Sequence, residues 1–285
     1  MKTKKKKKYT VLGVAAAALI VLCVTALWRG LTVKTYTETT NKIHSEIRVA
    51  VIADLHSVLY GHKQQTLIKA IHKQKPDIIL LVGDIADDYK PIDGTIQLLS
   101  VIGKEYPCYY VTGNHEYWSG QIDLIEKIIS SYGVEILAGD SEIVQVRGQT
   151  LRLCGVDDPS AFESYRNISA IKAGSWKEQF NACKSQAKDD TYSILLSHRP
   201  ELTEEYKDSG FDLVIAGHAH GGQVRIPGIL NGLLAPNQGY FPKYAGGRFE
   251  LGETDMIVSR GLQKDSIPRV FNPPELVIVK LEPEK

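Results

Sequence analysis

Cysteine is scarce in this chain of 285 residues, which contains only four. No two of them form a CxxC pair, so neither a zinc knuckle nor a disulfide framework is expected. One lies in an N-terminal hydrophobic segment, and we interpret the other three as small buried side chains. These three are Cys108, Cys154 and Cys183.

Glycine-rich nucleotide fingerprints and an excess of basic residues in the body are also missing. Neither a P-loop nor a GxGxxG pattern occurs, so nucleotide binding through a phosphate loop is not supported. The net charge is +1, but residues 1–30 contain seven Lys or Arg and no acid. The remainder has 27 basic and 33 acidic residues, a balance of −6. This balance argues against a nucleic-acid partner and against a secreted nuclease.

Charge is absent from residues 9–28, which follow a basic cluster in residues 1–8. Twenty helical residues span about 30 Å, the thickness of a bilayer core. The lysines favour a cytoplasmic N-terminus and would be unexplained in a buried globular helix, so we expect a transmembrane signal-anchor. The alternative is a signal peptide cleaved after Ala26, which would release the body outside the cytoplasm. Residues 29–46 are expected to be a polar linker before one domain, residues 47–285.

Apolar runs alternate with amphipathic segments along the body. This alternation predicts an α/β fold, a four-layer α-β-β-α sandwich of two mixed sheets with flanking helices. The expected strands are residues 47–53, 78–82, 108–111, 134–137, 143–146, 151–154, 192–196, 213–216, 255–259 and 276–281. The expected helices are residues 64–74, 92–102, 122–131 and 176–187.

Five polar motifs directly follow predicted strands and contain five of the eight histidines. Each motif alone is weak, since a strand-end Asp often caps a helix and a lone His is usually structural. Ligands bind at the carboxyl ends of strands in such sheets, so together the motifs predict one metal site. They are Asp54-Leu55-His56, Gly83-Asp84-Ile85-Ala86-Asp87, Gly113-Asn114-His115-Glu116, Ser197-His198 and Gly217-His218-Ala219-His220.

The ordered pattern D-x-H, G-D-x-x-D, G-N-H-[DE], H, G-H-x-H resembles the calcineurin-like metallophosphoesterase superfamily. The resemblance covers about residues 47–282. It is strongest to a membrane-associated bacterial phosphodiesterase branch with a G-H-x-H-G-G-Q sequence, here residues 217–223. Three tail segments are also similar to that branch, namely residues 239–242, 259–262 and 272–275.

The resemblance implies two divalent metal ions. Asp54, His56 and His220 would bind one ion, Asn114, His198 and His218 the other, and Asp84 would bridge both. An extended backbone would turn Asp54 and His56 to one side, since they are two residues apart. Two ions about 3.5–4 Å apart can clamp the attacking and leaving oxygens, and a bridging hydroxide would attack phosphorus. The mixed donor set suits Mn, Fe, Zn, Co or Ni, with manganese as a guess.

His115 has a different role in the family, where this histidine lies against the phosphate and the leaving oxygen. The resemblance therefore implies general-acid or electrostatic work for His115. Asp87 would orient His115 through a hydrogen bond. The alternative is that Asp87 is a solvent-facing loop acid, since Asp88 follows it.

The segment from Gln223 to Arg248 could also contribute to the site. It contains basic and aromatic residues that could grip a phosphate and a bulky group, although a plain packed loop is the interpretation we favour. They are Arg225, Tyr240, Phe241, Lys243 and Tyr244. Among the other histidines, His62 could approach the site mouth through its loop. We do not expect His44 or His72 there.

Together these features predict a dinuclear metal-dependent phosphoester hydrolase. Membrane attachment and the branch resemblance suggest phosphodiester or pyrophosphate bonds of lipid-linked or cell-envelope substrates. The alternative is a non-catalytic metal-binding or scaffolding membrane protein with the same fold. A degenerate enzyme usually lacks a ligand, and none is missing here. No obligate protein partner is evident.

Overall fold

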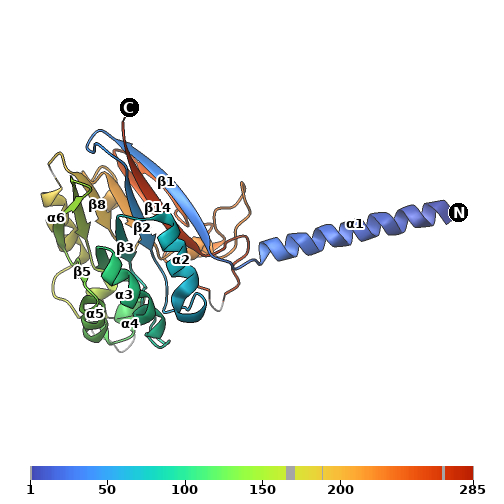
Figure 1. The fold of residues 1–285 in the computed structure, drawn as a ribbon, viewed down its shortest axis with the longest axis horizontal. Helices are drawn as coiled ribbons and strands as arrows, with labels where there is room; N and C mark the ends of the chain where they lie inside the picture. Colours follow the sequence, from blue (N-terminus) through green and yellow to red (C-terminus); the bar gives the residue numbers. More distant parts are fainter. Residues whose placement is uncertain (1, 165–170, 188, 265–266, 285) are drawn as a thin grey trace.

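The computed structural model describes residues 2–164, 171–187, 189–264 and 267–284, with side chains from residue 9 onward. A long helix, α1 (Lys2–Ala26), projects from a layered body (Figure 1). Its stretch Tyr9–Ala26 is long and apolar enough to cross a membrane, and only 6% of it is buried against the body. A signal sequence near the N-terminus has the same length and apolar composition.

Two six-stranded mixed sheets form the body. The first has the order β1 (Thr32–Thr40), β14 (Glu275–Pro283), β2 (Ile47–Ile52), β3 (Ile78–Val82), β4 (Cys108–Val111) and β5 (Val134–Ile136). The second has the order β12 (Gly247–Leu251), β13 (Thr254–Val258), β9 (Leu213–Ala216), β8 (Tyr192–Leu196), β7 (Gln149–Gly155) and β6 (Asp140–Val146). A small hairpin pairs β10 (Leu234–Ala235) with β11 (Gly239–Tyr240).

Helices cover the outer face of each sheet (Figure 1). One apolar cluster fills the space between the sheets, and two more lie under the helices. This arrangement confirms the predicted four-layer sandwich. The first sheet is covered by α2 (Gln65–Gln74), α3 (Asp93–Glu105) and α5 (Ile122–Ser131), and the second by α6 (Trp176–Gln186) and the short α7 (Thr203–Tyr206). Short helical turns complete the fold: α4 (Asn114–Trp118), η1 (His62–Gln64), η2 (Pro159–Ala161) and η3 (His220–Gly222).

The predicted linker at residues 29–46 is wrong, because most of it is the edge strand β1. This strand pairs with β14 from Thr32 to Thr40. Threonine is β-branched and favours strands, but an edge strand of Thr, Lys and Glu lacks the apolar run on which the prediction relied. Glu38, buried on β1, also pairs with Arg248 of β12 at 2.9 Å. The domain therefore begins before residue 47, and β1 ties the two sheets together at one edge.

The strand directions place α1 at a particular end of the body. β1 runs parallel to β14, and β14 runs antiparallel to β2. The start of β1 therefore lies at the same end of the sheet as the carboxyl end of β2. Residues 27–31 alone separate α1 from β1, and the Phe271 N–H donates to the Ala26 carbonyl at 2.7 Å. The apolar helix thus joins the body at the carboxyl ends of the parallel strands.

Candidate metal centre

The five motifs meet at the carboxyl ends of strands from both sheets. Ligand atoms of four residues lie within 4.8 Å of one another, and those of two further groups of three do likewise. The first group is Asp54, His56, Asp84 and His220, the second is Asp84, His198 and His218, and the third is His56, Asp87 and His115. The first two groups share Asp84, and we call them the two ligand groups. Its Oδ2 lies 3.6 Å from His56 Nε2 and 3.1 Å from His198 Nε2.

Several polar atoms in this cluster are buried without a hydrogen-bond partner. A buried polar group normally has one, since leaving it unpaired costs about 1–3 kcal/mol. The unpaired atoms are carboxylate oxygens, an amide oxygen and imidazole nitrogens, which together are the donors of a mixed oxygen–nitrogen metal site. They are Asp54 Oδ2, Asp84 Oδ2, Asn114 Oδ1, His56 Nε2 and His198 Nε2. The residues therefore fit a pair of divalent cations.

Hydrogen bonds behind the imidazole rings explain why those nitrogens are free. His198 Nδ1 lies 2.9 Å from the Val82 carbonyl, and His56 Nδ1 lies 3.1 Å from Asp87 Oδ2. An acceptor at Nδ1 holds the proton there and leaves the Nε2 lone pair directed into the cluster. His220 Nδ1 contacts the Gln263 side chain in the same way.

The backbone is strained at five of the seven predicted ligand residues. Asp54, His56, Asp84, His218 and His220 all have positive φ, between 47° and 64°. The expectation of an extended backbone at Asp54 and His56 is therefore wrong. Such conformations cost on the order of 1–3 kcal/mol each and collect at functional sites, where the surrounding structure enforces them.

Glycines make room for the buried carboxylates. A Cβ on Gly217 would lie 2.7 Å from Asp54 Oδ2, and one on Gly261 would lie 2.6 Å from the same oxygen. Neither distance is tolerated by a real Cβ atom. A Cβ on Gly113 would collide with Asp84 in the same way. Gly113, Gly217 and Gly261 are thus required by the close approach of a carboxylate, whereas a Cβ on Gly83 would collide with the His198 ring.

The carboxylate that contacts His115 belongs to Asp88 and not to Asp87. The predicted hydrogen bond from Asp87 to His115 is wrong, because Asp87 is held against His56 and also accepts from the Lys90 amine at 3.0 Å. Asp88 takes that place, with its Oδ1 2.6 Å from His115 Nδ1. Burial disfavours the charged form of His115, but the Asp84 and Asp88 carboxylates outweigh it and raise the pKa of His115. Its ring meets that of His56 edge-on at 4.4 Å.

Glu116, the last residue of its motif, is a buried backbone clamp. Its two carboxylate oxygens accept from four backbone N–H groups, at 2.7–3.0 Å. These belong to Asp84, Ile85, Ala86 and Gly113. Glu116 therefore fixes the loops that present two neighbouring motifs.

Arg199 and Asn237 are contacts of the site that the sequence did not predict. Arg199, which follows a motif histidine, is buried and bonded to Asp158. Its Nη1 lies 3.1 Å from His218 Nε2, and Asn237 Oδ1 lies 2.9 Å from the same nitrogen. Its position directly after His198 was the one feature of the sequence that could have indicated that Arg199 lies at the site. By contrast His62, His44 and His72 belong to none of the ligand groups of the described residues.

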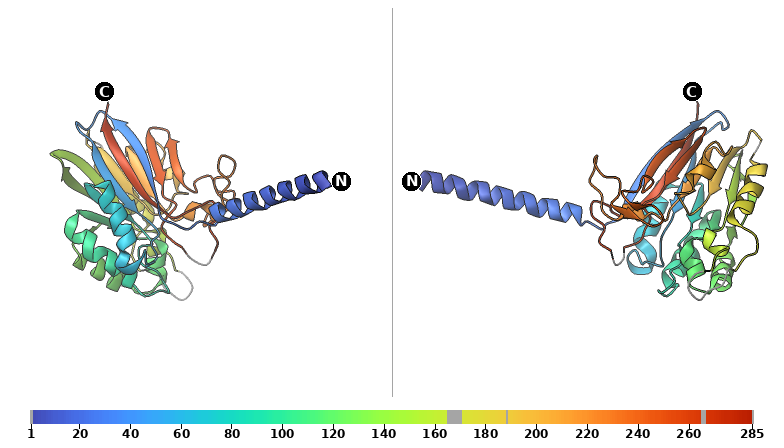
Figure 2. Two further views of the ribbon diagram at one scale, coloured as in Figure 1. Left: turned by 45° about the vertical axis from the view of Figure 1, so that its right-hand side comes forward. Right: turned by 180° about the vertical axis from the view of Figure 1, so that it is seen from behind.

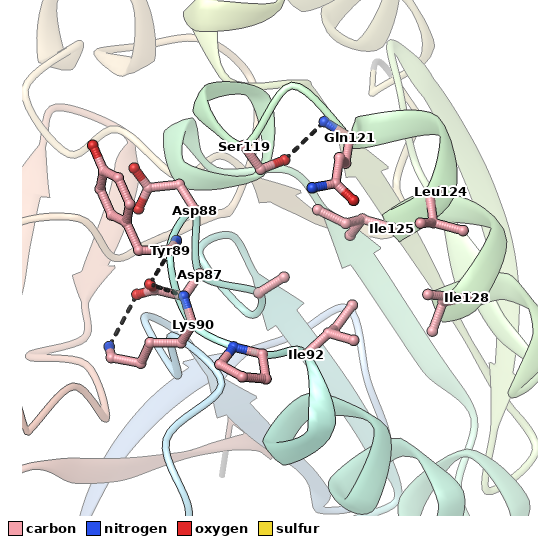
Figure 3. A pocket seen from close by; sticks show the side chains of 12 residues that line it. Asp87, Asp88, Tyr89, Lys90, Ile92, Ser119, Gln121, Leu124, Ile125 and Ile128 are labelled. Atoms are coloured by element: carbon pink, nitrogen blue, oxygen red, sulfur yellow. Dashed lines mark hydrogen bonds and ion pairs between the residues drawn. The ribbon is translucent and has the colours of Figure 1, made fainter.

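Two cavities are lined in part by residues that contact the cluster. One of about 370 Å³ opens beside the Asp87–Asp88 loop and is floored by apolar side chains of α5 (Figure 3). Figure 3 shows Leu124, Ile125 and Ile128 facing the loop across this space. The other, of about 530 Å³, is lined by Trp118, Arg199 and Asn237 among others.

Residues 47–222 match the model of the calcineurin-like phosphoesterase family. The chain belongs to this family, and it is a metallophosphoesterase with a candidate dimetal site. It is 29% identical to the Bacillus subtilis protein YpbG, with 95% of each chain covered. It is 28% identical to the uncharacterized metallophosphoesterase Cj0846 of Campylobacter jejuni, covering 85% of this chain and 61% of that one.

A solved structure with the same fold is that of TT1561 from Thermus thermophilus. Its TM-score is 0.50 at 12% identity, with 76% of this chain and 90% of that chain covered. At this identity the likeness supports the fold alone, which agrees with the two mixed sheets described above.

Proposed function

We propose that this chain hydrolyses phosphoesters with two divalent metal ions. Asp54, His56 and His220 would hold one ion, Asn114, His198 and His218 the other, and Asp84 both. The observation that carries the proposal is the convergence of buried, unpaired carboxylate, amide and imidazole atoms at one point. When bound, the ions would supply an activated water and positive charge for the phosphate.

The chain's own residues would position the substrate and move a proton. His115, oriented by Asp88, would donate a proton to the leaving oxygen or neutralise its charge. Asp87 would orient His56, and so act on a ligand rather than on the substrate. The mixed donor set suits Mn, Fe, Zn, Co or Ni, and manganese is our first choice for assays.

We further propose phosphodiester or pyrophosphate substrates that are lipid-linked or part of the cell envelope, as in the G-H-x-H-G-G-Q branch. In support, α1 joins the body at the same end of the sheet as the ligand cluster. The lysine cluster favours a single-pass anchor with the body outside the cytoplasm. Cleavage after Ala26 would instead release it, and mass analysis of the mature N-terminus separates the two.

The test is hydrolysis of bis-p-nitrophenyl phosphate by the purified full-length protein with added manganese. We expect turnover that depends on the metal and is lost in Asp84→Ala. A panel of monoesters, diesters and pyrophosphates then ranks the substrate classes. Turnover no higher than that of Asp84→Ala with each of the five metals would support a non-catalytic metal-binding protein instead.

A further inference from the structure

Half of the exposed large apolar side chains of the described body lie in one stretch of the sequence. Beyond residue 30, six of the twelve exposed large apolar side chains in the described residues fall between residues 226 and 267. The most exposed of these are Ile229 at 84%, Tyr240 at 73% and Phe241 at 69%. Side chains of this kind, gathered on one surface, usually mark an interaction site. We call the six the apolar rim: Ile226, Ile229, Leu234, Tyr240, Phe241 and Ile267.

Backbone hydrogen bonds connect the apolar rim to the base of α1. The Arg225 N–H donates to the Val270 carbonyl, and the next residue, Phe271, donates to Ala26 at the end of the helix. The Phe241 N–H donates to the Leu233 carbonyl, which holds the two arms of the loop together. Both views of Figure 2 show this orange loop beside the body end of α1, on the side from which the helix leaves.

The length of α1 leaves little distance between the body and a membrane. The eighteen residues of Tyr9–Ala26 give about 27 Å of helix, close to the thickness of the bilayer core. Ala26 already touches the body, so no spacer separates the span from the rim. Trp28 and Arg29 follow the helix directly and are exposed, and such residues suit the membrane–water interface.

The rim is also continuous with the ligand cluster. His220 begins the turn that leads into the rim loop, and Asn237 in that loop contacts His218. Lys243, two residues after Phe241, is exposed and adds positive charge beside the rim. Aromatic and aliphatic tips with flanking cations are the composition of an interfacial membrane contact.

We propose that the apolar rim inserts into the outer part of the lipid bilayer that α1 crosses, so that the mouth of the metal centre faces the membrane surface. This rests on the membrane attachment proposed above, but not on the catalytic activity. It predicts that the enzyme takes phosphate groups displayed at the surface of a bilayer.

The test uses the full-length protein in lipid nanodiscs with an environment-sensitive fluorophore on single cysteines. Cys23 is exposed on α1 and the other three cysteines are buried, so the native chain labels at Cys23 and reports helix insertion. The rim is probed with Ile229→Cys and Phe241→Cys in a Cys23→Ala background. Ile143→Cys, an exposed apolar position on β6, is the matched control.

We expect blue-shifted emission at positions 229 and 241 that is quenched by lipids with a nitroxide near the headgroup, and neither effect at 143. Emission at 229 and 241 equal to that at 143 would overturn the proposal. A blue shift without quenching by nitroxide lipid would also overturn it, because a protein would then cover the rim. Loss of quenching at Cys23 would locate the failure in membrane attachment. Hydrolysis of bis-p-nitrophenyl phosphate, measured in the same samples, reports separately on the catalytic proposal.

Discussion

At the scale of single residues, two adjacent carboxylates serve two different histidines. Asp87 is bonded to His56, which lies in a group that contains Asp84, whereas Asp88 is bonded to His115, which lies in neither of the two groups that share Asp84. A carboxylate behind an imidazole fixes its tautomer and raises its basicity. The two acids should therefore affect two separable properties, metal affinity and turnover.

Asp87→Asn and Asp88→Asn test this division. We expect Asp87→Asn to weaken metal binding by roughly 10- to 100-fold, because His56 loses its orienting charge. Asp88→Asn should leave metal affinity near that of the native protein and lower kcat by a similar factor. Metal titration and kcat at saturating metal measure the two effects. If Asp88→Asn changed metal affinity as much as Asp87→Asn, the proposed division would be wrong.

Glu116→Gln should be strongly destabilising. Each carboxylate oxygen accepts two backbone N–H bonds, and a glutamine would place an NH₂ group against one of these pairs. Two buried donors without an acceptor cost roughly 2–6 kcal/mol. Urea unfolding measures the loss, with Glu135→Gln on the exposed face of β5 as the control. Equal stability of the two variants would contradict the clamp.

The seven proposed ligands could be predicted because each lies in a short motif that follows a largely buried strand. The supporting residues could not, since spacing alone does not decide whether Asp87 or Asp88 reaches His115. Asn237 is 19 residues from its partner His218 and lies in the turn between β10 and β11. The backbone strain could not be predicted from the sequence either, because the positive φ of Asp54 depends on the packing around it.

At the scale of elements, the buried strands could be predicted from the sequence more readily than the exposed ones. β3 and β8 are buried along their whole length and appear as plain apolar runs. The edge strands β1 and β12 consist mostly of exposed and partly buried positions. The polar composition of β1 was interpreted as a linker, and β12 was not predicted as a strand. Edge strands are held by pairing more than by burial, which composition alone does not report.

The element β1 should be necessary for a stable domain. A chain beginning at residue 31 retains it, whereas one beginning at residue 47 loses nine paired positions with β14 and the Glu38–Arg248 ion pair. We expect the shorter chain to unfold several kcal/mol more easily and to self-associate, because β14 becomes an exposed edge. Size-exclusion chromatography and urea unfolding compare the two chains. Matching behaviour would show that β1 is dispensable.

At the scale of the whole molecule, the metal centre is where the two sheets meet. Asp54, His56 and Asp84 follow strands of the first sheet, while His198 and His218 follow strands of the second. A metal ion that binds residues of both sheets, and binds only the folded state, stabilises the packing of the two sheets against each other. Bound metal is therefore expected to stabilise the entire sandwich and not only the loops around it.

Metal addition should raise the free energy of unfolding by about 2.7 kcal/mol at a free concentration 100 times Kd. Asp84→Asn should abolish most of this increase, because Asp84 belongs to both ligand groups. Asp88→Asn is the matched control. In the part of the chain that the structure describes, the Asp88 side chain is bonded to His115 and to no residue of the two ligand groups. Urea unfolding with and without manganese measures the increase. If manganese raised the free energy of unfolding of Asp84→Asn as much as that of the native chain, the metal would be bound elsewhere. A cation held between the sheets would lose affinity on removal of the Asp84 charge, because Asp84 is the carboxylate that the two ligand groups share.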